Sequence, residues 1–207
     1  MNIAPLELAP AAVALRGSAI AAALLRLAGW RLLFAGLPSQ QGVAVVYPHT
    51  SNWDFVVLLL AKWAIGLPVT FWSKGTLFHW PLFGRWLRWI GGRPVARQTA
   101  QGAVAQMLID MRAACHEGRF MWLGLAPEGT RQRTAGWRTG FYRVAVQTGV
   151  PVGLVVLDYK QRRVGFDSFW RLSGDPVADL ATFERRFAGC RGHRPHLAAP
   201  VRLLETR

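Results

Sequence analysis

Two titratable side chains stand five positions apart where one apolar segment gives way to another. The stretch YPHTSNWDF, residues 47–55, places His49 and Asp54 between the run VAVVY and a second apolar run. A carboxylate that accepts the Nδ1 proton of an imidazole leaves Nε2 free as a base and stabilises the imidazolium that forms. The pair therefore indicates general-base chemistry, although a surface histidine and a helix-start charge would give the same pattern.

A second polar group follows another apolar segment. Glu128, Gly129, Thr130 and Arg131 come directly after residues 119–125 in the stretch LAPEGTRQRTAG. If both apolar segments are parallel strands, this turn and His49 meet at the same edge of the sheet, where α/β proteins bind ligands. A glycine lets the backbone approach a ligand, and an arginine can grip a phosphate with two hydrogen bonds. Taken alone, EGTR also fits an ordinary turn with a solvated ion pair.

The elements that must position these groups alternate along the chain. Strands are predicted at 43–47, 68–72, 119–125, 150–158 and 163–167, and helices at 11–36, 53–65, 80–90, 99–117, 138–148 and 177–188. Short apolar runs between helical segments are typical of an α/β fold, with a mostly parallel central sheet flanked by helices on both faces. Ser51 or Asn52 is expected to cap the helix at 53–65, with Asp54 in its first turn.

The N-terminal region has the pattern of a helix that lies on a membrane. Between Ala11 and Leu37, Arg16, Arg26 and Arg31 fall within an arc of about 140° on a helical wheel, with apolar residues around the remainder. That distribution suits an interfacial helix, and it also suits an amphipathic helix packed on the core. We therefore divide the chain into an amphipathic, interfacial helix at 1–38 and one catalytic domain at 39–207.

Composition restricts the partners. The chain has 207 residues, 52% hydrophobic and 17% charged, with 25 Lys plus Arg against 11 Asp plus Glu and a formal charge of +14. This balance predicts an anionic partner.

Cys115 and Cys190 have no metal-binding spacing, which favours a reducing compartment. Pro195 and Pro200 predict a loose C-terminal tail, in which the histidines are solvated.

Four blocks in a fixed order add a family resemblance. HTSNWD carries an H-x4-D pattern, and WSKGTLF, GGRPVAR and PEGTR follow it. Over roughly residues 40–160 the chain resembles the glycerolipid acyltransferases, specifically the bacterial 1-acyl-sn-glycerol-3-phosphate (lysophosphatidate) acyltransferases. The H-x4-D pattern alone is weak, whereas four ordered blocks are specific.

The resemblance implies a role for each matching residue. His49 would be the general base and Asp54 would orient it. An acceptor pocket would be formed by Glu128, Gly129, Thr130 and Arg131, with Arg131 on the acceptor phosphate and with added positive charge from Lys74 and Arg97. Such enzymes need no metal or bound cofactor, and they transfer the acyl group from acyl-CoA or acyl-carrier protein to a lysophospholipid. They work at the membrane surface, so the chain is expected at the cytoplasmic face of the cell membrane as a peripheral or monotopic protein.

Other functions stay open at this point. Gly75 and Thr76 replace an acidic position found in many relatives, so another lysolipid, alcohol or amine could be the acceptor. A nucleic-acid-binding protein could use the positive charge, but the arginines are spread along the chain and no such motif is present, so we expect no nucleic-acid partner. A metal-dependent hydrolase lacks the paired-histidine spacing H-E-x-x-H. A lipid-binding protein of the same fold without catalysis is also compatible with the sequence.

Overall fold

A single eight-stranded sheet organises the chain. The computed structural model describes residues 5–10, 13, 15–95 and 100–204. The strand order is β1-β8-β7-β3-β6-β4-β5, and β2 also pairs with β8. Neighbouring strands from β7 through β3, β6 and β4 to β5 are parallel, whereas β8 runs antiparallel to both β7 and β1. The sheet is therefore mixed, with its parallel part in the centre and at the β5 edge.

The strands and helices have the following bounds. The strands are β1 Leu6–Leu8, β2 Arg31–Leu33, β3 Gln41–Tyr47, β4 Val69–Lys74, β5 Gly92–Val95, β6 Met121–Leu125, β7 Val152–Asp158 and β8 Arg163–Arg171. The helices are α1 Ala19–Leu27, α2 Trp53–Ile65, α3 Pro81–Trp89, α4 Ala100–His116, α5 Gly140–Thr148 and α6 Pro176–Phe187. Two 3₁₀ turns, η1 Gly75–His79 and η2 Pro195–Leu197, complete the described elements.

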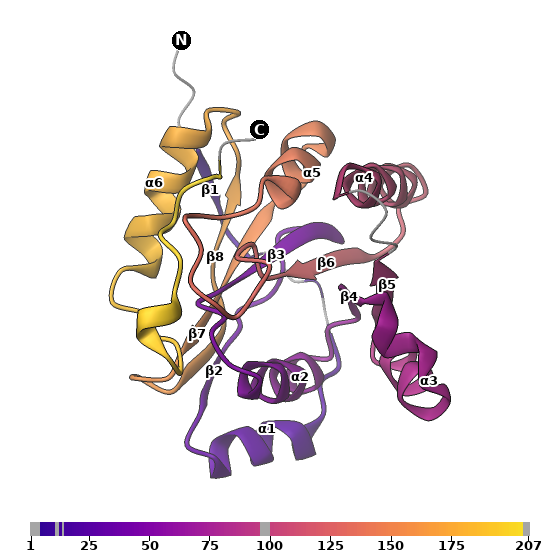
Figure 1. Cartoon of the computed structure of the whole chain (residues 1–207), viewed down its shortest axis with the longest axis vertical. Coiled ribbons are helices and arrows are strands. Elements are labelled where there is room, and N and C mark those ends of the chain that lie inside the picture. The colour runs from indigo at the N-terminus through magenta and orange to yellow at the C-terminus, as the bar shows by residue number, and fades with distance from the viewer. Residues whose placement is uncertain (1–4, 11–12, 14, 96–99, 205–207) are drawn as a thin grey trace.

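Alternating side chains of the central strands pack into two separate hydrophobic cores, one on each face of the sheet. Val43 and Val45 of β3 pack with α4, α5 and α6 on one face, whereas Ala44 between them packs on the other face. This follows from the two-residue repeat of a strand, which sends successive side chains to opposite faces. Figure 1 shows α4, α5 and α6 on one side of the sheet and α1 with α2 on the other. The predicted α/β class with flanking helices is confirmed.

Most predicted elements lie where the sequence placed them. The helix expected at 53–65 is α2 with the same bounds, and the helices expected at 80–90, 99–117 and 138–148 differ by no more than two residues at either end from α3, α4 and α5. The short strand β5 was not predicted. Its residues, GRPV, include an arginine and a proline, so they lack the apolar run by which the other strands were identified.

The N-terminal region differs from its prediction. A helix was expected over 11–36, of which residues 11, 12 and 14 lie outside the described residues. Among the others, α1 covers Ala19–Leu27, and residues 31–33 form β2. Both β1 and β2 pair with β8, so this region contributes to the same sheet as the rest of the chain. Gly29, with a φ of +76°, lies between α1 and β2 and allows the chain to reverse there. None of the helices in the described ranges is long and apolar enough to cross a membrane.

The C-terminal region is also different from its prediction. Residues 189–204, which we call the C-terminal strap, were expected to be a loose tail. Figure 1 shows the strap, in yellow, running back alongside α6 toward the C-terminus. Its backbone pairs with Trp137, which donates to the carbonyl of Arg202 and accepts from the amide of Leu204. The strap is therefore a fixed part of the fold.

Candidate active site

The loop between β3 and α2 is built around the carboxylate of Asp54. Asp54 lies in the first turn of α2 and is fully buried. Its Oδ2 accepts the backbone N–H groups of Thr50 at 2.8 Å and Ser51 at 2.9 Å. Ser51 in turn accepts the N–H of Trp53 through its hydroxyl, while Asn52 makes no capping bond with its side chain. The aspartate thus folds the preceding residues into a tight loop that starts the helix.

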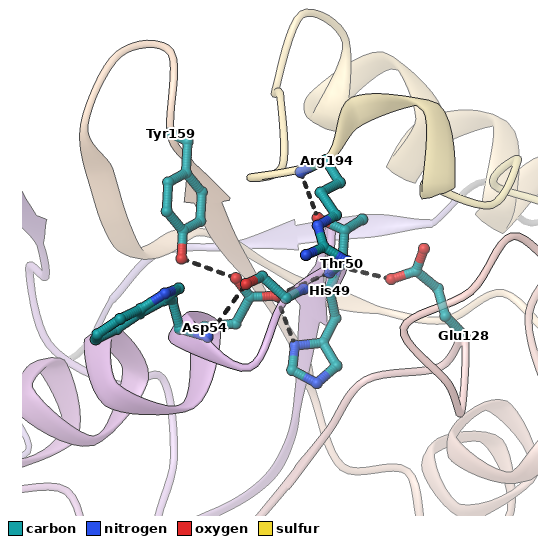
Figure 2. A network of polar contacts seen from close by, with 8 residues as sticks. His49, Thr50, Asp54, Glu128, Tyr159 and Arg194 are labelled. Atoms are coloured by element: carbon teal, nitrogen blue, oxygen red, sulfur yellow. Dashed lines mark hydrogen bonds and ion pairs between the residues drawn. The ribbon is translucent and has the colours of Figure 1, made fainter.

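The same carboxylate faces the imidazole of His49. Nδ1 of His49 lies 3.1 Å from Oδ2 of Asp54, and the histidine side chain is 17% exposed (Figure 2). The pair is in ion-pair contact, and Nδ1 makes no hydrogen bond of standard geometry within the described residues. Because Nδ1 faces the carboxylate, Nε2 points away from it and is the ring atom available to a substrate. The structure brings together the two residues expected to form a base and its partner.

Burial and hydrogen bonding act in opposite directions on Asp54. Its burial raises the pKa, but the contacts from His49, the N–H of Ser51 and the hydroxyl of Tyr159 outweigh burial and hold the pKa of Asp54 below its usual value. The carboxylate is therefore ionised at neutral pH. An ionised partner is what a histidine base requires, because it stabilises the imidazolium formed when the proton is taken up.

Tyr159 belongs to this group, and the sequence analysis did not include it. Its hydroxyl donates to Oδ1 of Asp54 at 2.8 Å from the end of β7 (Figure 2). Burial, together with the neighbouring carboxylate, raises the pKa of Tyr159, so the hydroxyl keeps its proton and remains a donor. A signal existed: Tyr159 directly follows a predicted strand that runs parallel to the one before His49.

Glu128 supports the loop from a buried position. It is 1% exposed, and its carboxylate accepts the backbone N–H of His49 at 2.7 Å and that of Ala199 at 2.9 Å. Burial raises the pKa of Glu128, although the two N–H donors lower it in part. Sequence reasoning placed Glu128 in an acceptor pocket. In the structure it joins the His49 loop to the C-terminal strap.

The next two residues have local roles. Gly129 has a φ of +67°, and a Cβ there would come within 2.4 Å of Nε of Arg138. The side chain of Arg138 therefore packs directly against this glycine. Thr130 accepts the N–H of Gln132 at 3.3 Å and so shapes the turn. Both residues set the path of the chain toward Arg131.

A cavity lies on the loop that follows His49. Its volume is about 680 Å³, and it is lined by residues 50–53, residues 131–133, Arg194 and Leu197. Arg131 lines this cavity together with Thr50 and Ser51, which follow His49 in the chain, whereas His49 itself is not one of the lining residues. Arg133 and Arg194 add two guanidinium groups that the predicted site did not contain. The cavity is therefore strongly cationic and suits an anionic ligand.

Two predicted site residues are not placed in this cavity. Lys74 ends β4, and the structure does not describe its side chain. Arg97 lies outside the described residues. Within the ranges that are described, no group of three His, Cys, Asp or Glu side chains is arranged to hold a metal ion.

The C-terminal strap closes over the His49 loop. The N–H of Arg194 donates to the hydroxyl of the buried Thr50 at 3.1 Å, and the Tyr47 hydroxyl donates to the carbonyl of Ala199 at 2.8 Å. His193 packs edge-on against Tyr159, with ring centroids 5.1 Å apart. The sequence analysis assigned this region to a loose tail, because no local pattern connects Arg194 to a residue 144 positions earlier.

One of the comparisons with known proteins, a match to a family model, agrees with the acyltransferase resemblance seen in the sequence. A family model described as Acyltransferase matches residues 35–157. No curated protein sequence matches the chain. Among solved structures, the crystal structure of the 1-acyl-sn-glycerophosphate (LPA) acyltransferase PlsC from Thermotoga maritima is similar, with 19% identity and a TM-score of 0.47. That match covers 70% of this chain and 63% of the other, so the chain spans under two thirds of that protein's length.

Proposed function

This chain belongs to the acyltransferase family, and from that premise we propose that it acylates the free hydroxyl of a lysophospholipid. The proposed acceptor is 1-acyl-glycerol-3-phosphate, which would give phosphatidate, and the donor is a thioester, either acyl-CoA or acyl-carrier protein. The observation that carries the proposal is the His49–Asp54 pair beside a cavity that contains Arg131. A base next to a cationic cavity suits an alcohol that carries a phosphate.

The proposed reaction needs only proton transfer and electrostatic help from the protein. Nε2 of His49 takes the proton from the acceptor hydroxyl as its oxygen attacks the thioester carbonyl carbon. The tetrahedral intermediate then collapses, the C–S bond breaks, and the thiolate takes the proton from the imidazolium to leave as a thiol. Asp54 keeps Nδ1 oriented and stabilises the imidazolium between the two proton transfers. No metal or bound cofactor has a step in this scheme.

The acceptor phosphate is assigned to Arg131. This side chain is exposed and lines the cavity together with Thr50 and Ser51, the two residues that follow the base. A guanidinium forms two parallel hydrogen bonds with a phosphate, which holds the neighbouring hydroxyl in a defined orientation. An acceptor without a phosphate, such as another alcohol or an amine, would not use this contact.

The product of the reaction tests the proposal. The protein is supplied with labelled acyl-CoA or acyl-carrier protein and a panel of lysolipids, and the products are identified by mass spectrometry. Phosphatidate formed from 1-acyl-glycerol-3-phosphate is the expected result. Acylation of uncharged alcohols in preference to every phosphate-bearing lysolipid would assign the enzyme a different acceptor.

Membrane contact is proposed at α1 and α3. Ile20, Leu24 and Leu27 of α1 follow the i, i+4, i+7 spacing of one helical face, and all three are exposed. On α3, Leu82 and Trp89 are 83% and 75% exposed. Apolar side chains of this kind insert into the interface of a bilayer, and nearby cations attract anionic headgroups. We place these surfaces at the cytoplasmic face of the cell membrane, where the proposed substrates meet.

Substitution of the exposed α1 face tests this docking. The triple variant Ile20→Ser, Leu24→Ser, Leu27→Ser should sediment less with anionic phospholipid vesicles, because it loses apolar area without touching the core. Ile109→Ser with Val177→Ser is the matched control, since both side chains are exposed on the other helices. Equal sedimentation of the triple variant and the unmodified protein would exclude docking through α1.

A further inference from the structure

Three guanidinium groups surround the cavity next to His49, and one of them comes from the C-terminal strap. Arg131 and Arg133 follow β6, while Arg194 reaches the cavity from the far end of the chain. None of the ion pairs in the described part of the structure involves any of the three. Within the described residues no carboxylate neutralises their charges, so an anion would be attracted to the space between them.

The backbone of the strap is fixed at the point from which the Arg194 side chain leaves it. The Arg194 N–H is bonded to Thr50, and a Cβ on Gly192 would come within 2.6 Å of the same hydroxyl, so the strap lies in close contact with the loop. One residue before Gly192, the carbonyl of Arg191 accepts the N–H of Tyr159 at 2.8 Å. These contacts position the start of the side chain, which lowers the entropy lost when the guanidinium binds a ligand.

The nearby carboxylates are already occupied. Asp54 accepts from the loop amides and Tyr159, and Glu128 accepts from His49 and Ala199. Neither of them is paired with Arg194. Figure 2 shows the Arg194 side chain beside the Thr50–Asp54 loop, with Glu128 on the other side of Thr50. The guanidinium of Arg194 is consequently available to a substrate.

We propose that Arg194 is a phosphate-binding residue of this enzyme, supplied by the C-terminal strap and acting with Arg131 in one cavity. This inference rests on the proposed function and adds to it a specificity residue outside the region that matches the acyltransferase family model, residues 35–157. The shared chemistry is a phosphate group on a substrate. It can belong to the acceptor, as a phosphomonoester, or to the donor, as the phosphates of coenzyme A.

Steady-state kinetics of Arg194→Gln tests the assignment and separates the two sources. If the phosphate is that of the acceptor, KM for 1-acyl-glycerol-3-phosphate rises about tenfold, as expected for loss of one charge-assisted hydrogen bond, while kcat changes little. KM for a 1-acylglycerol without phosphate then stays the same. If the phosphate is that of the donor, the rise is in KM for acyl-CoA and is absent for acyl-pantetheine.

Arg191→Gln is the matched control. It removes the same charge from the same strap, but Arg191 is exposed and does not line the cavity. Thermal unfolding of both variants checks that the strap still folds. An Arg194→Gln enzyme with unchanged KM for every substrate would overturn the proposal, as would an Arg191→Gln enzyme with the same losses, because net charge alone would then explain them.

Calorimetric titration tests phosphate binding by Arg194 independently of whether the protein transfers an acyl group. Glycerol 3-phosphate and coenzyme A are titrated into the unmodified protein and into both variants. Weaker binding of one of these ligands to Arg194→Gln alone supports the phosphate site even if no acyl acceptor in the panel is turned over. Equal affinities in all three proteins refute it even if the unmodified enzyme makes phosphatidate.

Discussion

The His49 loop and the C-terminal strap lie against each other, but they are held in different ways. The turn of the loop itself is shaped by bonds between close neighbours, since Asp54 accepts from Thr50 and Ser51, four and three residues away, and Glu128 and Tyr159 add support from distant segments. The bonds of the strap reach across the chain, with Arg194 to Thr50 separated by 144 residues. The loop can therefore form as α2 begins, whereas the strap has a defined position only when the whole sheet is assembled.

The two regions therefore have different roles, the loop in the reaction itself and the strap in binding and stability. In the proposed mechanism His49 of the loop acts on the reacting atoms. The strap contributes the Arg194 guanidinium to the cavity and packs against the loop through the bond from Arg194 to Thr50. Glu128 connects the two regions through one carboxylate. Substitutions in the loop should affect turnover most, and substitutions in the strap should affect substrate binding and stability.

The largest expected effect belongs to His49→Ala. Loss of a positioned general base should lower kcat by about 10²–10⁴-fold with little change in unfolding temperature, since the imidazole makes no hydrogen bond that meets standard geometry. His116→Ala, an exposed histidine at the end of α4, should behave like the unmodified enzyme. A His49→Ala enzyme with undiminished turnover would remove the base from the mechanism and leave the loop without a chemical role.

Asp54→Asn should lower turnover less and stability more. An amide offers only one oxygen to the donors that Asp54 now satisfies, which should reduce the free energy of unfolding by about 1–3 kcal/mol. Because the folded pKa of Asp54 is lowered, the carboxylate stabilises the protein above its unfolded pKa, and this contribution is lost as the pH falls through the folded value. The difference in unfolding free energy between the two proteins should therefore shrink in acid, which denaturant titrations at several pH values would measure. A difference in unfolding free energy that does not change with pH would show that the charge of Asp54 does not contribute to stability.

Glu128→Gln should loosen the strap from the loop. The amide keeps one acceptor for two backbone donors, so we expect a loss of about 1–2 kcal/mol and faster proteolysis between residues 189 and 204. Because burial raises the folded pKa, the advantage of Glu over Gln should decline as the pH rises through that value. Glu117→Gln, an exposed site, serves as the control. Unaltered cleavage of the strap would mean that Glu128 does not hold it.

Gly192→Ala should have the smallest effect of the series. A methyl group would meet the Thr50 hydroxyl at 2.6 Å and displace the strap slightly, costing about 1 kcal/mol or less if the loop can yield. KM for the phosphate-bearing substrate should rise in parallel, because Arg194 moves with the strap. Ala198→Ser, a half-buried position of the strap, is a suitable control. If Gly192→Ala binds substrate normally while Arg194→Gln does not, affinity depends on the guanidinium of Arg194 and not on the exact position of the strap.

The sequence by itself determined the elements with local patterns and the pair of residues at the candidate base. Helix α2 and the proximity of His49 to Asp54 both follow from interactions within a few residues, so the apolar run and the H-x4-D spacing were sufficient. The same holds for Arg131, which follows a predicted strand that proved to be parallel to β3. Patterns of this kind are visible without knowledge of the rest of the fold.

Only the tertiary structure decided the partners that come from distant parts of the chain. Residues 31–33 form a strand because β8 offers them an edge, although their apolar and basic pattern favoured a helix. Tyr159, the buried position of Glu128 and the contribution of Arg194 likewise depend on which strand ends meet. A hydrogen bond between residues more than 70 positions apart leaves no periodic signal in the sequence, because its donor and acceptor are brought together by the sheet and not by the chain between them.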